Sequence, residues 1–149
     1  MKRVAVALLC LLSFDIAKAD EVSMISHGFS KHLDNHNFNE RNYGVGLRYE
    51  HDDFGLQAGG FRNSVNKNSF YAGIDWVPFR YTTNTCFSID AGPFYGFATG
   101  YKFDITPLIG LQSSIKCDNM FARVRIMPDP YYNSKGIGAI EFGVVVKRF

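Results

Sequence analysis

The sequence has no apolar run long enough to cross a membrane as a helix. Its apolar segment Val4–Leu12 falls well short of the roughly 20 residues that a spanning helix needs. Two basic residues precede this run and the pattern Ala17-Lys18-Ala19 follows it, which is the layout of a secretory signal peptide. We therefore expect cleavage before Asp20, with residues 1–19 as the signal peptide and 20–149 as one mature domain.

Cysteine is scarce, and the formal net charge is only +2. Cys10 leaves with the predicted signal peptide and has no convincing small residue after it, so a lipoprotein anchor is not expected. Cys86 and Cys117 are too few and too far apart to suggest a metal site. We expect no metal, no other cofactor and no nucleic-acid partner, whereas export makes a disulfide permissible.

The mature chain instead shows alternating apolar and polar residues, interrupted by polar turns. Residues 41–51 illustrate it, with Tyr43, Val45 and Leu47 on one face and Arg48 and Glu50 on the other. Each such segment is near the ~9–11 residues of a tilted membrane strand. The predicted strands are 22–31, 41–51, 54–62, 69–77, 86–97, 106–116, 120–127 and 136–149, with a turn at 78–85.

Alternation alone fits both a soluble β-sandwich and a membrane barrel. The polar faces carry four charges of each sign, which could pair inside a closed lumen where an isolated charge would be costly. They are Arg48, Lys116, Arg123 and Arg125 against Glu50, Asp75, Asp90 and Glu141. The signal peptide and the terminal Phe149 also favour the barrel. We predict an all-β, eight-stranded antiparallel up-and-down transmembrane β-barrel of the outer-membrane type.

Two details follow from this strand assignment. Phe149 falls on the opposite parity from Ile140 and Phe142, so the last strand should contain a bulge or a slip. With the mature N-terminus in the periplasm, Cys86 opens one strand and Cys117 closes the next at the periplasmic rim. Opposed strand positions are close enough for a disulfide, and the alternative is two rim thiols.

Several short motifs occur in order along the mature chain. They are Phe38-Asn39-Glu40-Arg41 with Gly44-Val45-Gly46-Leu47, Phe61-Arg62-Asn63-Ser64-Val65-Asn66-Lys67, Ala72-Gly73-Ile74-Asp75-Trp76, and Arg125-Ile126-Met127-Pro128 with Tyr132-Asn133 and Gly136. In this order and spacing the chain resembles the lipid A palmitoyltransferase (PagP) family. The resemblance implies an eight-stranded outer-membrane barrel that moves a palmitoyl chain from a phospholipid donor to lipid A.

The resemblance also implies site residues. The family uses a His on or after the first strand, and an Asp-Ser pair in the second external loop. Ser64 matches the Ser, and Asn63 stands where the family has Asp. The His is open between His32 and His27. Uniform alternation would put His32 inside and His27 outside, which favours His32. A neutral His can take a proton near pH 7, and Ser64 could orient substrate or donate to an oxyanion.

Two further positions bear on the substrate. Asp75 aligns with the small residue that forms the floor of the family's acyl pocket, and a charge there is incompatible with a hydrocarbon end. The pocket should therefore be shorter, shifted or absent. Pro107 and Pro128 are expected to weaken strand pairing, and in the family such a gap admits lipid from the membrane. The family's amphipathic helix before the first strand is missing here.

The leading hypothesis is a monomeric outer-membrane lipid A acyltransferase. The alternative is a non-enzymatic small outer-membrane barrel with an adhesive or structural role. A lipid A deacylase ranks third, because the late His-x-Ser pattern of that group is absent.

Overall fold

A computed structural model describes residues 20–33, 38–83, 86–129 and 134–149, so the predicted signal peptide lies outside the described residues. The strands are β1 (Glu21–His32), β2 (Arg41–His51), β3 (Phe54–Arg62), β4 (Asn68–Trp76), β5 (Phe79–Thr82), β6 (Phe87–Ala98), β7 (Thr106–Cys117), β8 (Met120–Asp129) and β9 (Ser134–Arg148). No helix in these ranges is long and apolar enough to span a membrane.

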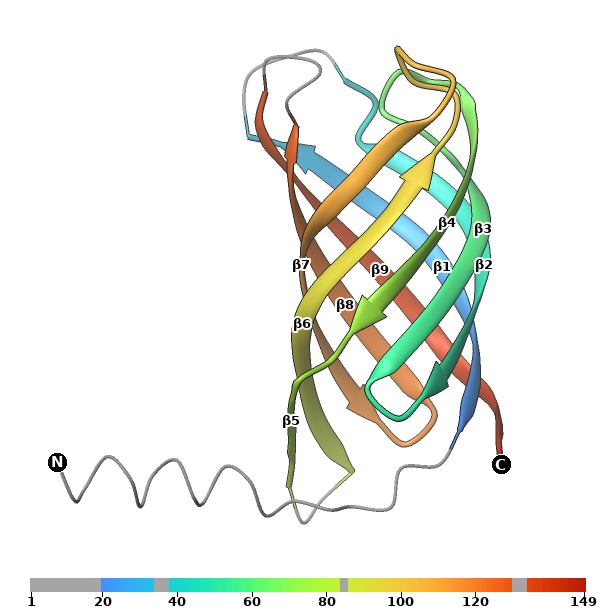
Figure 1. Ribbon diagram of the computed structural model, residues 1–149, viewed down its shortest axis with the longest axis vertical. Coiled ribbons are helices and arrows are strands. Elements are labelled where there is room, and N and C mark those ends of the chain that lie inside the picture. Colours follow the sequence, from blue (N-terminus) through green and yellow to red (C-terminus); the bar gives the residue numbers. More distant parts are fainter. Residues whose placement is uncertain (1–19, 34–37, 84–85, 130–133) are drawn as a thin grey trace, which may run out of the picture.

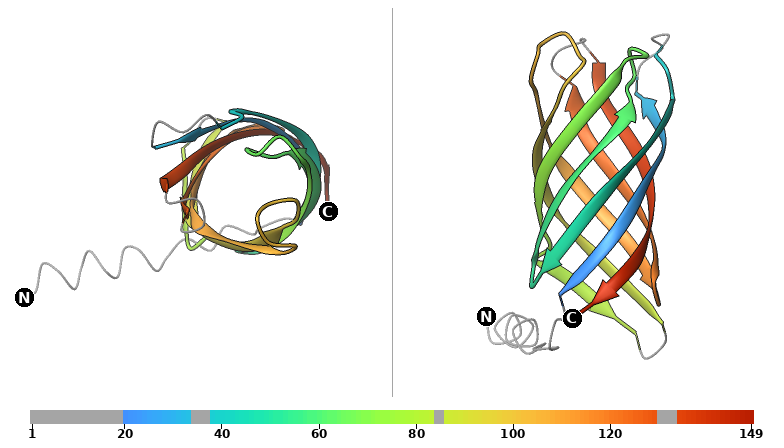
Figure 2. Two further views of the ribbon diagram at one scale, coloured as in Figure 1. Left: turned by 90° about the horizontal axis from the view of Figure 1, so that it is seen from above. Right: turned by 90° about the vertical axis from the view of Figure 1, so that its right-hand side faces the viewer.

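The strands close into an antiparallel barrel (Figures 1 and 2). β1 pairs with both β2 and β9, and β4 pairs with β6, which completes the ring. The short strand β5 lies beyond the end of β4 and pairs with β6. The prediction of eight barrel strands is confirmed. Only the predicted turn at 78–85 needs correction, because the chain resumes pairing directly after Val77-Pro78.

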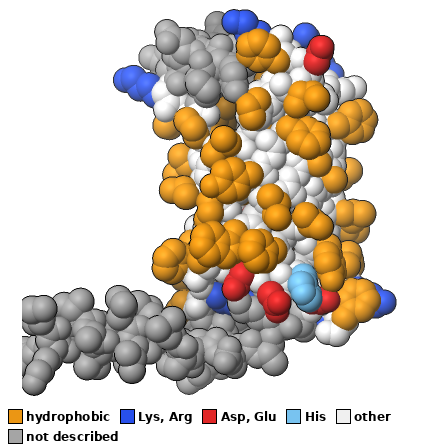
Figure 3. Space-filling model, in the orientation of Figure 1, with side chains coloured by type: hydrophobic (Ala, Val, Ile, Leu, Met, Phe, Trp, Pro, Cys, Tyr) orange, Lys and Arg blue, Asp and Glu red, His pale blue; other side chains and the backbone are white. Residues whose placement is uncertain are grey.

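The outer wall is apolar and the interior is polar. Large apolar side chains, such as Tyr43, Val45 and Leu47, are exposed around the middle of the barrel (Figure 3). Arg48 and Glu50, on the opposite face of the same strand, are buried. This arrangement inverts that of a soluble protein and is the one that a lipid environment favours. The sandwich alternative is therefore excluded.

The eight predicted lumen charges all face inward, and they pair. Arg48 Nη2 lies 2.6 Å from Asp75 Oδ2, and Arg48 also contacts Glu50. Arg125 Nη1 lies 2.9 Å from Glu141 Oε1. Arg123 Nη1 lies 3.7 Å from Glu141 Oε2. Nearer the start of β1, Arg80 pairs with Asp90 and Glu50, and Lys116 pairs with Glu21 and Glu50. Arg80 was missed from the sequence because it lies in the segment that was read as a turn.

Two predicted details of the rim are confirmed. The register of β9 against β1 shifts between Val22 and Ser23, so β9 bulges near its end and Phe149 changes parity. Cys86 and Cys117 form a disulfide with Cα atoms 4.7 Å apart. Both features lie at the end of the barrel where β1 begins and β9 ends (Figure 1).

The Arg48–Asp75 pair makes a stability prediction. Asp75→Ala would leave the Arg48 guanidinium buried without its main partner. We expect the free energy of unfolding to fall by roughly 3–5 kcal/mol, the usual cost of breaking a buried pair. Urea unfolding of the barrel in detergent measures it. Asp104→Ala removes an exposed loop carboxylate and is the matched control. Equal stability of the two variants would contradict the prediction.

Candidate functional site

A bulge in β1 decides which residues of that strand face the lumen. The register of β1 against both neighbours shifts between His27 and Phe29, where Gly28 is the extra residue opposite β9. Before the bulge the odd positions are inside, and Ile25 is 1% exposed. After it the even positions are inside, and Ser30 is buried. The expectation that His27 faces lipid is therefore wrong, because it assumed uniform alternation.

His27 points into the lumen and is held there by a carboxylate. Its Nδ1 lies 3.1 Å from Glu141 Oε1, and its side chain is only 10% exposed. Its ring packs edge-on against Tyr71, with ring centroids 4.8 Å apart, and also contacts Phe61. Nε2 is buried and has no hydrogen-bond partner among the described residues. A histidine tied at Nδ1 and free at Nε2 has the geometry of a general base.

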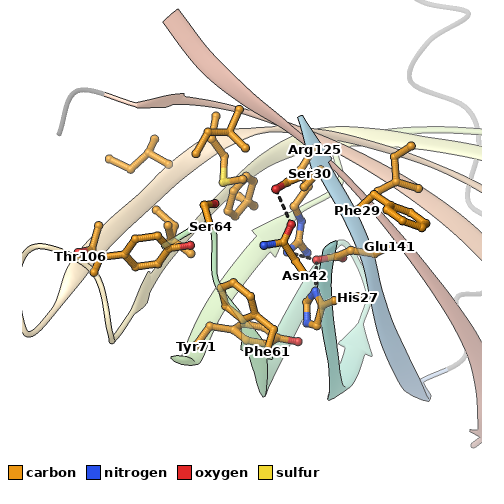
Figure 4. A pocket seen from close by; sticks show the side chains of 18 of the residues that line it. His27, Phe29, Ser30, Asn42, Phe61, Ser64, Tyr71, Thr106, Arg125 and Glu141 are labelled. Carbon is orange, nitrogen blue, oxygen red and sulfur yellow. Dashed lines mark hydrogen bonds and ion pairs between the residues drawn. The ribbon is translucent and has the colours of Figure 1, made fainter. Parts of the chain in front are cut away.

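His27 lines a cavity inside the barrel (Figure 4). The cavity measures about 100 Å³. Apolar groups dominate its wall, among them Phe61, Phe94 and Leu108. Arg125 and Glu141 close it toward the ion pairs of the lower lumen. The site thus joins one polar end to an apolar space, which is the usual character of a small-molecule pocket.

Ser64 and Asn63 have different surroundings. Ser64 lines the same cavity as His27, although no hydrogen bond joins these two described residues (Figure 4). Asn63 is fully buried in the loop after β3. Its Nδ2 donates to Ser69 Oγ at 2.9 Å and to the Gly100 carbonyl at 2.8 Å. Its Oδ1 accepts from the backbone N–H groups of Val65 and Lys67. Asn63 therefore ties two loops together.

Asn63 acts on the loops at the upper mouth. In the view down the barrel, residues 63–67 and the β6–β7 loop lean inward over the opening (Figure 2). Ser69 reinforces the link by donating to the Thr99 carbonyl. Asn63 thus helps to hold both loops in this inward-leaning position, a role that suits an amide because an amide both donates and accepts hydrogen bonds.

Two other predicted site residues lie outside this cavity. His32 is buried, as expected, but it stacks on Phe38 with ring centroids 4.0 Å apart and does not line the cavity. Asp75 faces inward, as expected, but its carboxylate is engaged by Arg48. Asp75 is not among the residues that line this cavity, whose Arg and acidic members are Arg125 and Glu141.

The cavity borders a gap in the barrel wall. Pairing between β7 and β8 runs from Cys117↔Met120 up to Leu111↔Ile126 and then stops. Above this point β7 remains paired with β6, and β8 with β9. Pro107 and Pro128 lie on the two separated edges, and both line the cavity. Proline cannot donate to a ladder, so the prediction of weakened pairing is confirmed.

Three cavity residues were missed from the sequence as site residues: Tyr71, Thr106 and Glu141. Glu141 was recognised as a lumen charge, but its approach to His27 depends on the β1 bulge. Tyr71 OH and Thr106 Oγ1 are buried, with no hydrogen-bond partner among the described residues. The sequence could have indicated these residues only by their polar side chains at inward strand positions. That two of the side chains have no hydrogen-bond partner among the described residues is seen only in the structure.

No family model matches the sequence, and no curated protein matches it. Among solved structures, the barrel is similar to the crystal structure of Ail, the attachment invasion locus protein of Yersinia pestis. The TM-score is 0.53 at 13% identity, covering 90% of this chain and 100% of that chain. Ail in a phospholipid nanodisc matches at a TM-score of 0.44 and 14% identity, covering 87% and 99%. The likeness shows the fold, and the protein is a β-barrel of the bacterial outer membrane.

The contacts of Asn63 predict the effect of restoring an acid at that position. Asn63→Asp removes the Nδ2 donor and sets a carboxylate oxygen against the Gly100 carbonyl. We expect a loss of roughly 1–3 kcal/mol in the free energy of unfolding, the cost of a buried group left unsatisfied. Urea unfolding measures it. Asn66→Asp keeps the Oδ1 that accepts from Arg62 Nε at 2.9 Å and is the control. Higher stability of the Asn63→Asp variant than of the wild-type protein would refute this account.

Proposed function

We propose that the protein is an outer-membrane acyltransferase that moves an acyl chain from a phospholipid to lipid A. The observation that carries the proposal is the free His27 Nε2, buried at the polar end of an apolar cavity that borders a gap in the wall. The resemblance of the sequence to the lipid A palmitoyltransferase family supports the same reaction. His27 replaces His32 as the preferred base.

The chemistry assigned to these groups is a direct transfer. The acceptor hydroxyl of lipid A loses its proton to His27 Nε2 while its oxygen bonds to the ester carbonyl carbon of the phospholipid. Collapse of the tetrahedral intermediate breaks the bond to the glycerol oxygen, which leaves with the proton from His27. Glu141 holds Nδ1 and stabilises the imidazolium between these steps. Ser64, on the same cavity, orients the substrate.

The gap between β7 and β8 supports entry of a lipid chain from the membrane side. An acyl chain that comes through the external mouth would have to leave the bilayer, which costs about 0.8 kcal/mol for each methylene group exposed to water. A lateral route keeps the chain in an apolar environment throughout. The cavity of about 100 Å³ is small beside the ~300–1,000 Å³ of typical ligand pockets. We therefore propose a shorter acyl segment than palmitate inside the barrel.

A second candidate is a non-enzymatic outer-membrane barrel that acts in adhesion. The structural similarity to Ail favours this candidate over the first, because Ail is an attachment and invasion protein. At 13% identity, however, this likeness shows a shared fold and does not by itself show a shared function. Adhesion would place function in the external loops and leave the His27–Glu141 pair without a role. The two candidates therefore differ in what a change at His27 does.

Mass spectrometry of lipid A tests the first candidate. Gram-negative cells that produce the protein should gain lipid A with one added acyl chain, and His27→Ala should remove that species because the base is gone. Ser64→Ala should lower its amount. His51→Ala, at the exposed periplasmic rim, is the matched control. Unchanged lipid A, with the folded barrel verified in the outer membrane, would leave the adhesion candidate, and loss of an acyl chain would indicate a deacylase.

A cross-link tests the lateral route. Continuing the register beyond Leu111↔Ile126 would place Ile109 opposite Pro128. In an Ile109→Cys, Pro128→Cys variant, oxidation should close the gap and stop acyl transfer, and a reductant should restore it. The control pair Leu111→Cys, Ile126→Cys joins strands that are already paired, so its oxidation should leave the rate unchanged. Full activity of the oxidised 109–128 variant would exclude entry between β7 and β8.

A further inference from the structure

Tyr71 places a second unpartnered polar atom beside His27. Its hydroxyl is buried and has no hydrogen-bond partner among the described residues. More than nine in ten buried polar groups in proteins are hydrogen-bonded, so a buried group without a partner calls for an explanation. Here two such groups, Tyr71 OH and His27 Nε2, belong to neighbouring rings of residues that line one cavity. A third, Thr106 Oγ1, lines the same cavity at the edge of the gap.

The chain makes room for this hydroxyl. The Tyr71 side chain extends from β4 past β3 to β2 along the inner wall, and a Cβ added at Gly46 would lie 2.1 Å from the Tyr71 hydroxyl oxygen. The ring is fixed by Phe61, with ring centroids 5.9 Å apart, and by His27. Figure 4 shows Tyr71, Phe61 and His27 grouped on one side of the cavity. The hydroxyl is thus held in one place, between Gly46 and the His27 ring, on a residue that lines the cavity.

We propose that Tyr71 is a catalytic residue whose hydroxyl donates a hydrogen bond to the carbonyl oxygen of an acyl ester bound beside His27. For its substrate class the proposal rests on the proposed acyl transfer. As the acceptor oxygen bonds to the carbonyl carbon, the electron pair of the C=O double bond moves to the carbonyl oxygen. Tyr71 OH stabilises this oxyanion until the pair re-forms the double bond and the glycerol oxygen leaves. A preorganised donor in a water-poor site is effective at this task.

The ester ligand also explains why the cavity mixes these groups with an apolar wall. An ester carbonyl accepts hydrogen bonds and donates none, so it suits Tyr71 OH. The alkyl chain beyond it requires the apolar wall that Phe61, Phe94 and Leu108 supply. A charged ligand would instead meet Arg125 and Glu141, which already pair with one another. A neutral acyl ester therefore fits this cavity better than a fatty-acid anion does.

Infrared spectroscopy tests the hydrogen bond without relying on turnover. Methyl laurate labelled with ¹³C at its carbonyl would be added to the full barrel in dodecyl maltoside, a detergent without a carbonyl group. In the wild-type protein the labelled carbonyl band should move to lower wavenumber than in micelles alone. Tyr71→Phe should lose this component and keep the aromatic ring. Tyr95→Phe, a lipid-facing tyrosine on β6 that is 52% exposed, is the control and should keep it.

The transfer assay supplies the second readout. Tyr71→Phe should lower kcat by roughly 100- to 1,000-fold, as loss of an oxyanion donor does, with little change in KM. If Tyr71→Phe does not fold, Gly46→Ala replaces it, because the added Cβ displaces the hydroxyl and should give the same losses.

The outcomes separate the two ideas. A wild-type carbonyl shift without acyl transfer would overturn the proposed function and leave the ester site standing. Wild-type transfer with an unimpaired Tyr71→Phe variant would overturn the role of Tyr71 and leave the proposed function standing. Absence of the shift in the wild-type protein, or its persistence in Tyr71→Phe, would overturn the hydrogen bond itself.

Discussion

The structure depends on charge neutralisation inside a closed ring of strands. The apolar side chains face outward, so the polar side chains of every strand meet in one lumen. A buried charge without a partner is very costly, and the lumen meets this requirement with ion pairs contributed by strands far apart in sequence. Arg48 of β2 engages Asp75 of β4, and Lys116 of β7 contacts Glu50 of β2. These pairs join opposite parts of the wall as well as neighbouring strands.

The ion pairs are not spread evenly, and this unevenness creates the site. The half of the lumen near the termini is occupied by Arg48, Glu50, Asp75, Arg80 and Lys116. The other half contains aromatic rings and the cavity. Glu141 lies at the boundary, where it binds Arg125 on one side and His27 on the other. His27 therefore contacts a carboxylate through Nδ1 and also lines the mainly apolar cavity.

The wall and the loops complete this arrangement at the external end. The β7–β8 ladder stops where the cavity begins. Asn63 ties the loop after β3 to the loop after β6 and draws both over the mouth. The cavity thus lies beside an interrupted β7–β8 ladder, at the end of the barrel where two loops lean inward. This arrangement is the one on which the proposed lateral entry of an acyl chain rests.

The sequence by itself determined the barrel, its strand bounds within a few residues and the inward-facing lumen charges, whereas the choice between a rim disulfide and two thiols was made only by the structure. The first three features follow from period-two alternation and from the cost of an unpaired charge, which are local or additive properties. The tertiary structure alone decided the site. One extra residue at Gly28 reversed the facing of the strand and brought His27 to Glu141. The partners of Asn63 and Asp75, and the absence of one for Tyr71 OH among the described residues, likewise depend on residues that come together only in the folded barrel.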